Sequence, residues 1–102
     1  MIARHWRGWT TVANANSYEN LLREKFLPEL KSRPGYRGGY VLRKDAPVEV
    51  EFVVINLFES LADVQALTGP NYSIPIFHPE ARQLLAKIEP LASHFEVRVS
   101  TV

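Results

Sequence analysis

His78 is the residue whose type and position best suit proton transfer. An imidazole exchanges a proton near neutral pH, and His78 directly precedes Pro79, which fits the first position of a helix. A ring held at the positive end of a helix would be favoured in its neutral, basic form. We therefore interpret His78 as a candidate general base. The alternative is that it serves only as a helix N-cap or as a loop residue, and the sequence leaves both open.

Further side chains are candidates for binding a ligand near this base, namely Trp6, Asn56, Tyr72 and Phe77. Trp6 could stack on an aromatic ligand, or it could be a core or dimer-interface residue. Asn56 interrupts an apolar strand, so it orients a ligand oxygen or a water, or it satisfies a neighbouring backbone group. Tyr72 and Phe77 lie in a long apolar segment with several prolines. We interpret this segment as a lid, or alternatively as a loop that covers the end of its own core or reaches over a partner subunit.

The first predicted strand, residues 2–10, carries two more groups of interest. Trp6 and Trp9 have opposite parity, so they face different sides of the strand. Arg4 has the parity of Trp6 and could meet an anionic ligand, although an ion pair is the commoner role of such a residue. His5 could lie beside His94 of the last strand. No third ligand has supporting spacing, however, so no metal site is expected.

The strand that must position Asn56 is the most informative element of the chain. Residues 48–58 first alternate between apolar and acidic side chains, and from Phe52 to Ile55 they are apolar at both parities. Because strand side chains alternate between faces, this half must be buried on both sides. A chain of this length with two or three short helices covers one face of a sheet only. We therefore expect a homodimer in which a second copy covers the other face.

The remaining elements complete a ferredoxin-like α+β fold. A helix that begins at the N-cap Asn16 has its apolar face interrupted by Pro28, which should kink it. Further elements are predicted as a strand over 36–43 bulged at Gly38-Gly39, a helix over 61–67 capped by Ser60, a helix from 79 to about 88, and a strand over 91–99. The order βαββαβ gives an antiparallel four-stranded sheet with the spatial order 4-1-3-2.

Length and composition bound the class of protein. The 102 residues predict a single domain, 1–102. The net charge of +1 comes from positive and negative residues interspersed along the chain, so no basic patch that would bind nucleic acid is expected. The absence of cysteine excludes disulfides and thiolate metal sites. No signal-peptide segment and no bilayer-spanning apolar run is present. We expect a cytoplasmic protein with neither a nucleic-acid nor a membrane partner.

Short segments with a recognisable pattern are spread over nearly the whole chain. They are Ile2-Ala3-Arg4, Gly8-Trp9-Thr10, Pro34-Gly35-Tyr36-Arg37-Gly38, Val50-Glu51-Phe52, Phe58-Glu59-Ser60-Leu61, His78-Pro79-Glu80-Ala81 and His94-Phe95-Glu96-Val97. With them the chain resembles the antibiotic biosynthesis monooxygenase family. The resemblance implies a dimeric α/β barrel, in which two ferredoxin-like sheets face each other.

The resemblance also implies a function. It suggests a cofactor-independent monooxygenase that uses neither metal nor flavin and acts on an aromatic or quinol-like molecule in an apolar pocket between helices and sheet. The haem-degrading branch of the family pairs an Asn on the first strand with a Trp on the second helix and a following His. Here only His78 falls in a comparable place, so we do not predict haem degradation. The competing hypotheses are a non-catalytic module that binds a small molecule and a purely structural homodimer.

Overall fold

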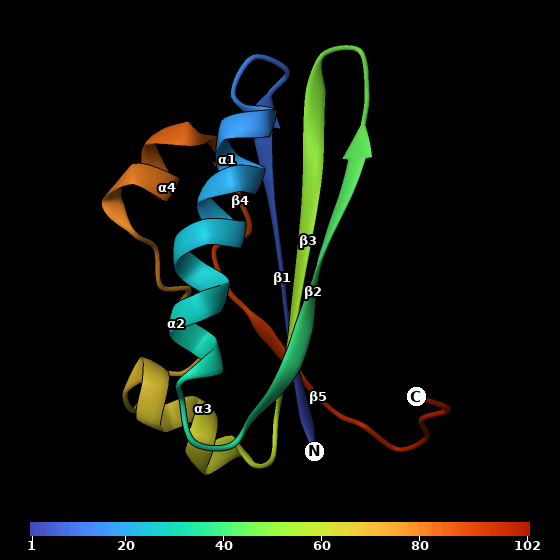
Figure 1. Cartoon of the computed structure of the whole chain (residues 1–102), viewed down its shortest axis with the longest axis vertical. Helices are drawn as coiled ribbons and strands as arrows, with labels where there is room; N and C mark the ends of the chain where they lie inside the picture. Colours follow the sequence, from blue (N-terminus) through green and yellow to red (C-terminus); the bar gives the residue numbers. More distant parts are fainter.

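The computed structural model describes all 102 residues and is built on one antiparallel sheet. Its strands are β1 (Ile2–Thr11), β2 (Tyr36–Asp45), β3 (Glu49–Phe58), β4 (Leu85–Ile88) and β5 (Ser93–Glu96). The order is β2-β3-β1-β4, and β5 pairs with β1 as well. This confirms the predicted α+β, ferredoxin-like arrangement with β1 and β3 in the centre (Figure 1).

The strand next to β1 differs from the prediction because two short strands share its edge. β5 pairs with one end of β1, where Arg4 is opposite His94, and β4 pairs with the other end, where Gly8 is opposite Ile88. The predicted helix from 79 to about 88 is therefore too long. The helix, α4, spans Pro79–Leu84, and the next four residues form β4 instead. Their spacing also suits a helix, but pairing with β1 determines the outcome.

The first helical segment consists of α1 (Ala15–Leu21), η1 (Leu22–Phe26) and α2 (Leu27–Lys31). The predicted N-cap at Asn16 is wrong, because α1 begins at Ala15 and Asn16 instead accepts a hydrogen bond from Arg43. The predicted disturbance at Pro28 is confirmed. The π-helix η1 lies just before this proline, with the Leu27 N–H donating to the Leu22 carbonyl. A proline cannot donate to the preceding turn, and a π-bulge is one way for a helix to adapt.

The helix α3 (Leu61–Thr68) forms as the sequence predicts. The Ser60 hydroxyl accepts from the Asp63 N–H at 3.3 Å, which is an N-cap, and Gly69 follows the last residue with a φ of 82°. The bulge predicted at the glycine pair of β2 is also present, because the register with β3 shifts between Tyr36 and Gly38. None of the helices is both long enough and apolar enough to cross a bilayer.

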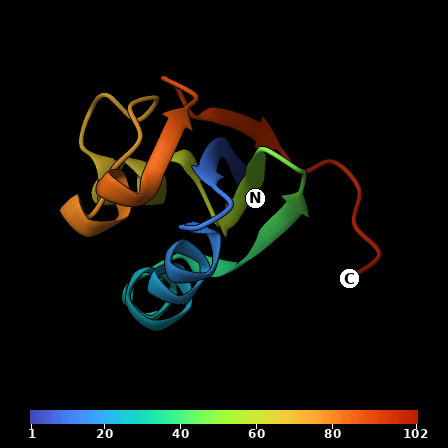
Figure 2. The same cartoon turned by 90° about the horizontal axis from the view of Figure 1, so that it is seen from above.

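All helices lie on one side of the sheet, and no element covers the other (Figures 1 and 2). The even-numbered residues of β3 are buried beneath the helices, with Phe52 and Phe58 completely inaccessible. The odd-numbered residues of β3 are only partly covered, and Tyr40, Leu42 and Phe95 are about half exposed. Because side chains alternate across a strand, the apolar ones among them, Val53, Ile55 and Leu57 of β3 with Tyr40, Leu42 and Phe95, lie on one surface, and Glu49 and Glu51 lie at its end. We call it the open face.

Candidate functional site

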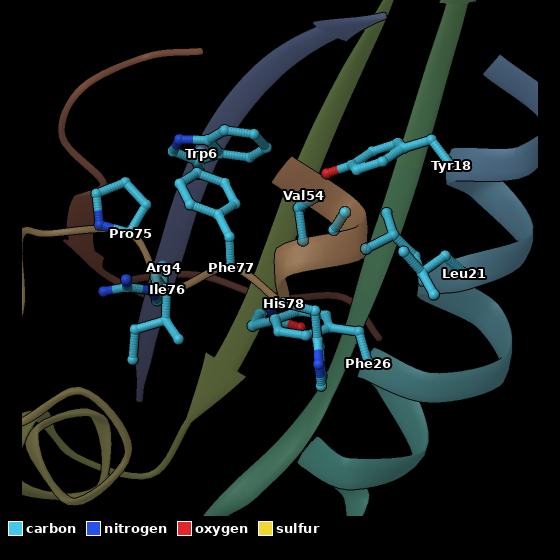
Figure 3. A pocket seen from close by; sticks show the side chains of 13 residues that line it. Arg4, Trp6, Tyr18, Leu21, Phe26, Val54, Pro75, Ile76, Phe77 and His78 are labelled. Atoms are coloured by element: carbon cyan, nitrogen blue, oxygen red, sulfur yellow. The ribbon is translucent and has the colours of Figure 1, made fainter. Parts of the chain in front are cut away.

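A small cavity lies between the helices and the covered face of the sheet (Figure 3). Its volume is about 60 Å³, and most of its lining is apolar. Strand, helix and loop each supply part of the wall, which consists of Arg4, Trp6, Tyr18, Leu21, Leu22, Phe26, Val54, Asn56, Pro75, Ile76, Phe77, His78 and Ala81. The cavity therefore contains four of the five predicted site residues, all except Tyr72.

A second, larger cavity of about 240 Å³ shares part of this wall. Residues common to both are Arg4, Phe26, Asn56, Ile76, Phe77 and His78. The second cavity adds more polar groups, including Glu29, Arg33 and Thr68. A ligand placed across the two would meet aromatic rings at one end and charged groups at the other.

Arg4 and Asn56 form the polar floor of both cavities. They are register partners on β1 and β3, so their side chains lie side by side on the covered face. Only 9% of Arg4 and 6% of Asn56 are exposed. Burial lowers the pKa of Arg4 from its ordinary value, yet a guanidinium stays charged at any physiological pH.

The loop over the cavity is fastened to this floor by Arg4. Its Nη1 donates to the Tyr72 carbonyl and lies 2.8 Å from Nε2 of His94, and its Nη2 donates to the Ile74 carbonyl at 3.3 Å. The segment therefore lies over the cavity and the core of its own chain.

Asn56 is held in one orientation by Tyr36. The Tyr36 hydroxyl donates to Oδ1 of Asn56 at 3.0 Å, and burial raises the pKa of this phenol, which keeps its proton in place. The Nδ2 group of Asn56 donates to no protein atom and is left to face the cavities. Gly39 makes this arrangement possible, because a Cβ there would lie 2.4 Å from Oδ1 of Asn56.

His78 lies at the junction of the cavities, where α4 begins. Its Nε2 is 3.1 Å from Oε2 of Glu29 on α2, and its ring meets the ring of Phe26 edge-on, with 6.5 Å between centroids (Figure 3). His78 occupies the N-cap position of α4, as the position of Pro79 predicts, but its side chain makes no capping hydrogen bond to the helix. A carboxylate only accepts, so Nε2 of His78 is the donor. In the neutral ring, Nδ1 then carries the lone pair.

The aromatic wall is formed chiefly by Trp6 and Phe77. Their rings meet edge-on at a centroid distance of 5.2 Å, and Nε1 of Trp6 donates to the Glu89 carbonyl at 2.9 Å. Gly8 leaves room for the indole, because a Cβ at this position would lie 2.3 Å from the Trp6 ring. Trp9 lies on the opposite face beneath Arg7 and Lys87, as its parity predicts.

Tyr72 lines neither cavity, so its proposed role as a wall residue is not retained. Its ring packs edge-on against His94 and near the buried cluster of Leu30, Phe58 and Val64, and only its carbonyl contributes, as an acceptor for Arg4. His5 and His94 do not face each other, since His94 pairs with Arg4 in register and His5 contacts Phe95 on the open face. No cluster of three potential metal ligands is present.

Sequence reasoning missed Glu29, Tyr18 and Tyr36 as parts of the site. Glu29 contacts His78 across 49 positions of sequence, and no motif links the two. Tyr18 looks like any apolar residue of an amphipathic helix. Tyr36 is opposite Phe58 in the register, and the bulge beside it lets its hydroxyl reach Asn56. The alternation of side chains along a strand does not predict where a side chain points beside a bulge.

No protein-family model and no curated protein sequence matches the chain. Among solved structures, one similar protein is described as an antibiotic biosynthesis monooxygenase from Bacillus cereus. It is 14% identical, with a TM-score of 0.69, over 99% of this chain and 96% of that one. Another is the heme-degrader MhuD from Mycobacterium tuberculosis, solved with two hemes in its active site. It is 20% identical, with a TM-score of 0.65, over the full length of both chains.

These similarities confirm the fold that the sequence predicts. They do not extend to a haem site, because the chain's own residues fit one poorly. Nε2 of His78, a nitrogen that could bind iron, is paired with Glu29, and the larger cavity of about 240 Å³ would hold a small aromatic molecule but not a haem.

Proposed function

We propose that this chain is a cofactor-independent monooxygenase that acts on an aromatic or quinol-like small molecule beside His78. The observation that carries the proposal is the His78–Glu29 pair at the edge of a cavity walled by aromatic rings. A histidine oriented by a carboxylate is a common form of general base. Membership of the antibiotic biosynthesis monooxygenase family is part of this proposal, supported by the sequence segments and the shared fold.

In the proposed reaction, Nδ1 of His78 takes the proton of a phenolic hydroxyl. The resulting anion passes an electron to dioxygen, and the radical pair recombines to form a carbon–oxygen bond. Loss of water then leaves a carbonyl, so that a phenol and one dioxygen give a quinone and one water. The balance needs no further oxidant or reductant. Glu29 holds the imidazole in the required tautomer through its bond to Nε2.

The apolar wall supplies the binding energy. Trp6 and Phe77 stack against the ring of the substrate, and the Nδ2 group of Asn56 donates to one of its oxygens. The segment containing Ile76 covers the site and excludes water, which protects the anion from reprotonation by solvent. Opening of this lid admits the substrate.

We further propose that the working unit is a homodimer joined through the open face. The apolar residues there, Val53, Ile55 and Leu57 with Tyr40, Leu42 and Phe95, are partly or about half exposed and lie side by side, and such patches often mark an interface with another protein. A second copy is the natural partner, because a two-fold axis pairs the face with itself.

Oxygen consumption tests the activity. The protein is incubated with a panel of hydroquinones and polycyclic phenols while dissolved oxygen is recorded, and His78→Ala is measured in parallel. The proposal expects uptake above buffer that falls by about 100-fold or more in the variant. Lack of uptake with every compound, or equal uptake by the variant, would contradict it. Lys87→Ala, a change on the opposite face of the sheet, is the control.

The second candidate is a module that binds a small molecule without changing it, or a structural homodimer. It is supported by the scarcity of titratable groups, since His78 and Glu29 are the only acid–base residues of the cavities besides the arginines and Tyr18. A thermal-shift screen separates the hypotheses. Compounds that stabilise the fold and are recovered unchanged favour binding over catalysis, and a lack of any stabilising compound favours the structural role.

A further inference from the structure

The covered side of the sheet contains a buried positive charge with no negative partner. Arg4 forms no ion pair, although every other buried or half-buried arginine of the sheet does, with Arg7 on Glu51 and Glu89 and Arg43 on Glu19 and Asp45. Its partners are two carbonyls and the imidazole of His94, all of which are neutral acceptors. Burying a charge without a counter-ion is costly, so a counter-ion is expected from outside the chain.

The rest of the wall does not provide this counter-ion. Glu29 is the only carboxylate that lines either cavity, and it is bonded to His78. The second cavity instead adds another cation, Arg33, which forms no ion pair. Desolvation and the nearby charge of Arg4 both lower the pKa of His94, so this ring adds an acceptor and no negative charge.

Asn56 increases the preference for an anion. Its Oδ1 is occupied by Tyr36, and only its N–H donors remain for a ligand, directly beside Arg4 on the neighbouring strand. The floor therefore consists of donors alone. Two such donors side by side match the two oxygens of a carboxylate, whereas a neutral ligand would leave the guanidinium uncompensated.

We propose that the ligand of this site is an aromatic carboxylate, whose acid group binds Arg4 and Asn56 while its ring lies between Phe26 and the wall formed by Trp6 and Phe77. The proposal rests on the proposed function for the aromatic part and adds the acidic group. The carboxylate then lies at the sheet, beside Arg4 and Asn56, and the reactive edge of the ring lies near His78. All three residues line the same cavity.

Isothermal titration with two matched probes tests this assignment on the unmodified protein. 2-Naphthoate and 2-naphthamide share a ring system and a planar substituent and differ in charge. We expect 2-naphthoate to bind about tenfold more tightly or better, as a charge-assisted pair in a buried site should. Equal affinities, or a preference for the amide, would overturn the proposal.

Variants then show which residues cause the preference for 2-naphthoate over 2-naphthamide. Arg4→Gln and the isosteric Asn56→Asp, which supplies an internal carboxylate to Arg4, are both expected to abolish the preference for the acid. Arg7→Gln, on the same strand but the opposite face, should retain it. If Arg4→Gln fails to fold, Asn56→Asp and the probe pair still decide the question. A preference that survives Asn56→Asp would count against the assignment.

The titration does not involve turnover, so it is independent of the oxygenase proposal. Preference for 2-naphthoate without oxygen uptake from any phenol would support the acid site and contradict the monooxygenase. Uptake that depends on His78, without any preference for the acid, would support the monooxygenase and contradict the acid site.

Discussion

Nε2 of His78 and Oε2 of Glu29 lie 3.1 Å apart, although the two residues are 49 positions apart in the chain. One residue lies at the start of α4 and the other on α2, so the contact forms only when both helices pack on the same face of the sheet. Both border the second cavity. We propose that this contact orients the partly exposed imidazole of His78 as a base.

Replacing Glu29 with Gln should therefore slow the reaction without weakening binding. Gln keeps the size of the side chain and removes the charge that fixes the tautomer of His78. We expect kcat to fall by about tenfold, less than for loss of His78 itself, and KM to stay the same. Glu80→Gln, which removes the surface pair with Lys25, is the matched control. A change in KM alone would show that Glu29 only shapes the pocket.

Gly39→Ala should disturb the floor of the site. The new Cβ would lie 2.4 Å from Oδ1 of Asn56 and 2.6 Å from the backbone oxygen of Ile55, so both must move. We expect a loss of about 1–3 kcal/mol in the free energy of unfolding, together with weaker ligand binding. Urea denaturation and titration measure the two effects. Tyr40→Phe, a change on the open face of the same strand, should alter stability by less than about 0.5 kcal/mol.

The homodimer can be broken at the centre of the open face. Ile55→Lys places a charge within the apolar surface, and we expect the variant to sediment as a monomer while the unmodified chain sediments as a dimer. Val48→Lys is the control, since Val48 is an exposed apolar residue in the turn before β3 and is not part of the open face. A monomeric unmodified chain, or a dimer that tolerates Ile55→Lys, would contradict the proposed interface.

His94 should make the fold sensitive to mild acid. Its folded pKa is lowered by desolvation and by Arg4, so below its ordinary value of 6.5 the unfolded chain binds a proton that the folded chain does not. The free energy of unfolding is therefore not reduced by His94 above about pH 6.5, and it falls as the pH decreases below that value. His94→Gln keeps an acceptor for Arg4 and removes this contribution. Urea midpoints at pH 7.5 and 5.5 should differ less in the variant, and an unchanged difference would exclude His94 as the source.

Much of the fold follows from alternation along the strands. The apolar run from Phe52 to Ile55 places β3 in the centre of the sheet, and the parity of β1 separates Trp6 from Trp9. The boundary between α4 and β4 does not follow in this way, because the spacing of Ala81, Leu85 and Ile88 suits a helix as well. Residues 85–88 form a strand because they pair with the free edge of β1 in the folded sheet.

The site is predictable to the same degree. His78, Trp6, Asn56 and Phe77 come together because their strands and loop are fixed by the sheet order. The contact of His78 with Glu29 and that of Tyr36 with Asn56 depend on helix docking and on a β-bulge, and neither is visible as a local pattern. Tyr72 shows the reverse error, since an aromatic residue in a lid can pack inward beneath the loop.

The proposed oxygenation is tested most directly with labelled oxygen. The protein is supplied with ¹⁸O-labelled dioxygen and the phenol that gives the fastest oxygen uptake, and the product is analysed by mass spectrometry. A monooxygenase of the proposed kind places one labelled atom in the quinone, and His78→Ala forms little of this product. A product whose new oxygen comes from water, or label incorporated equally well without His78, would contradict the account.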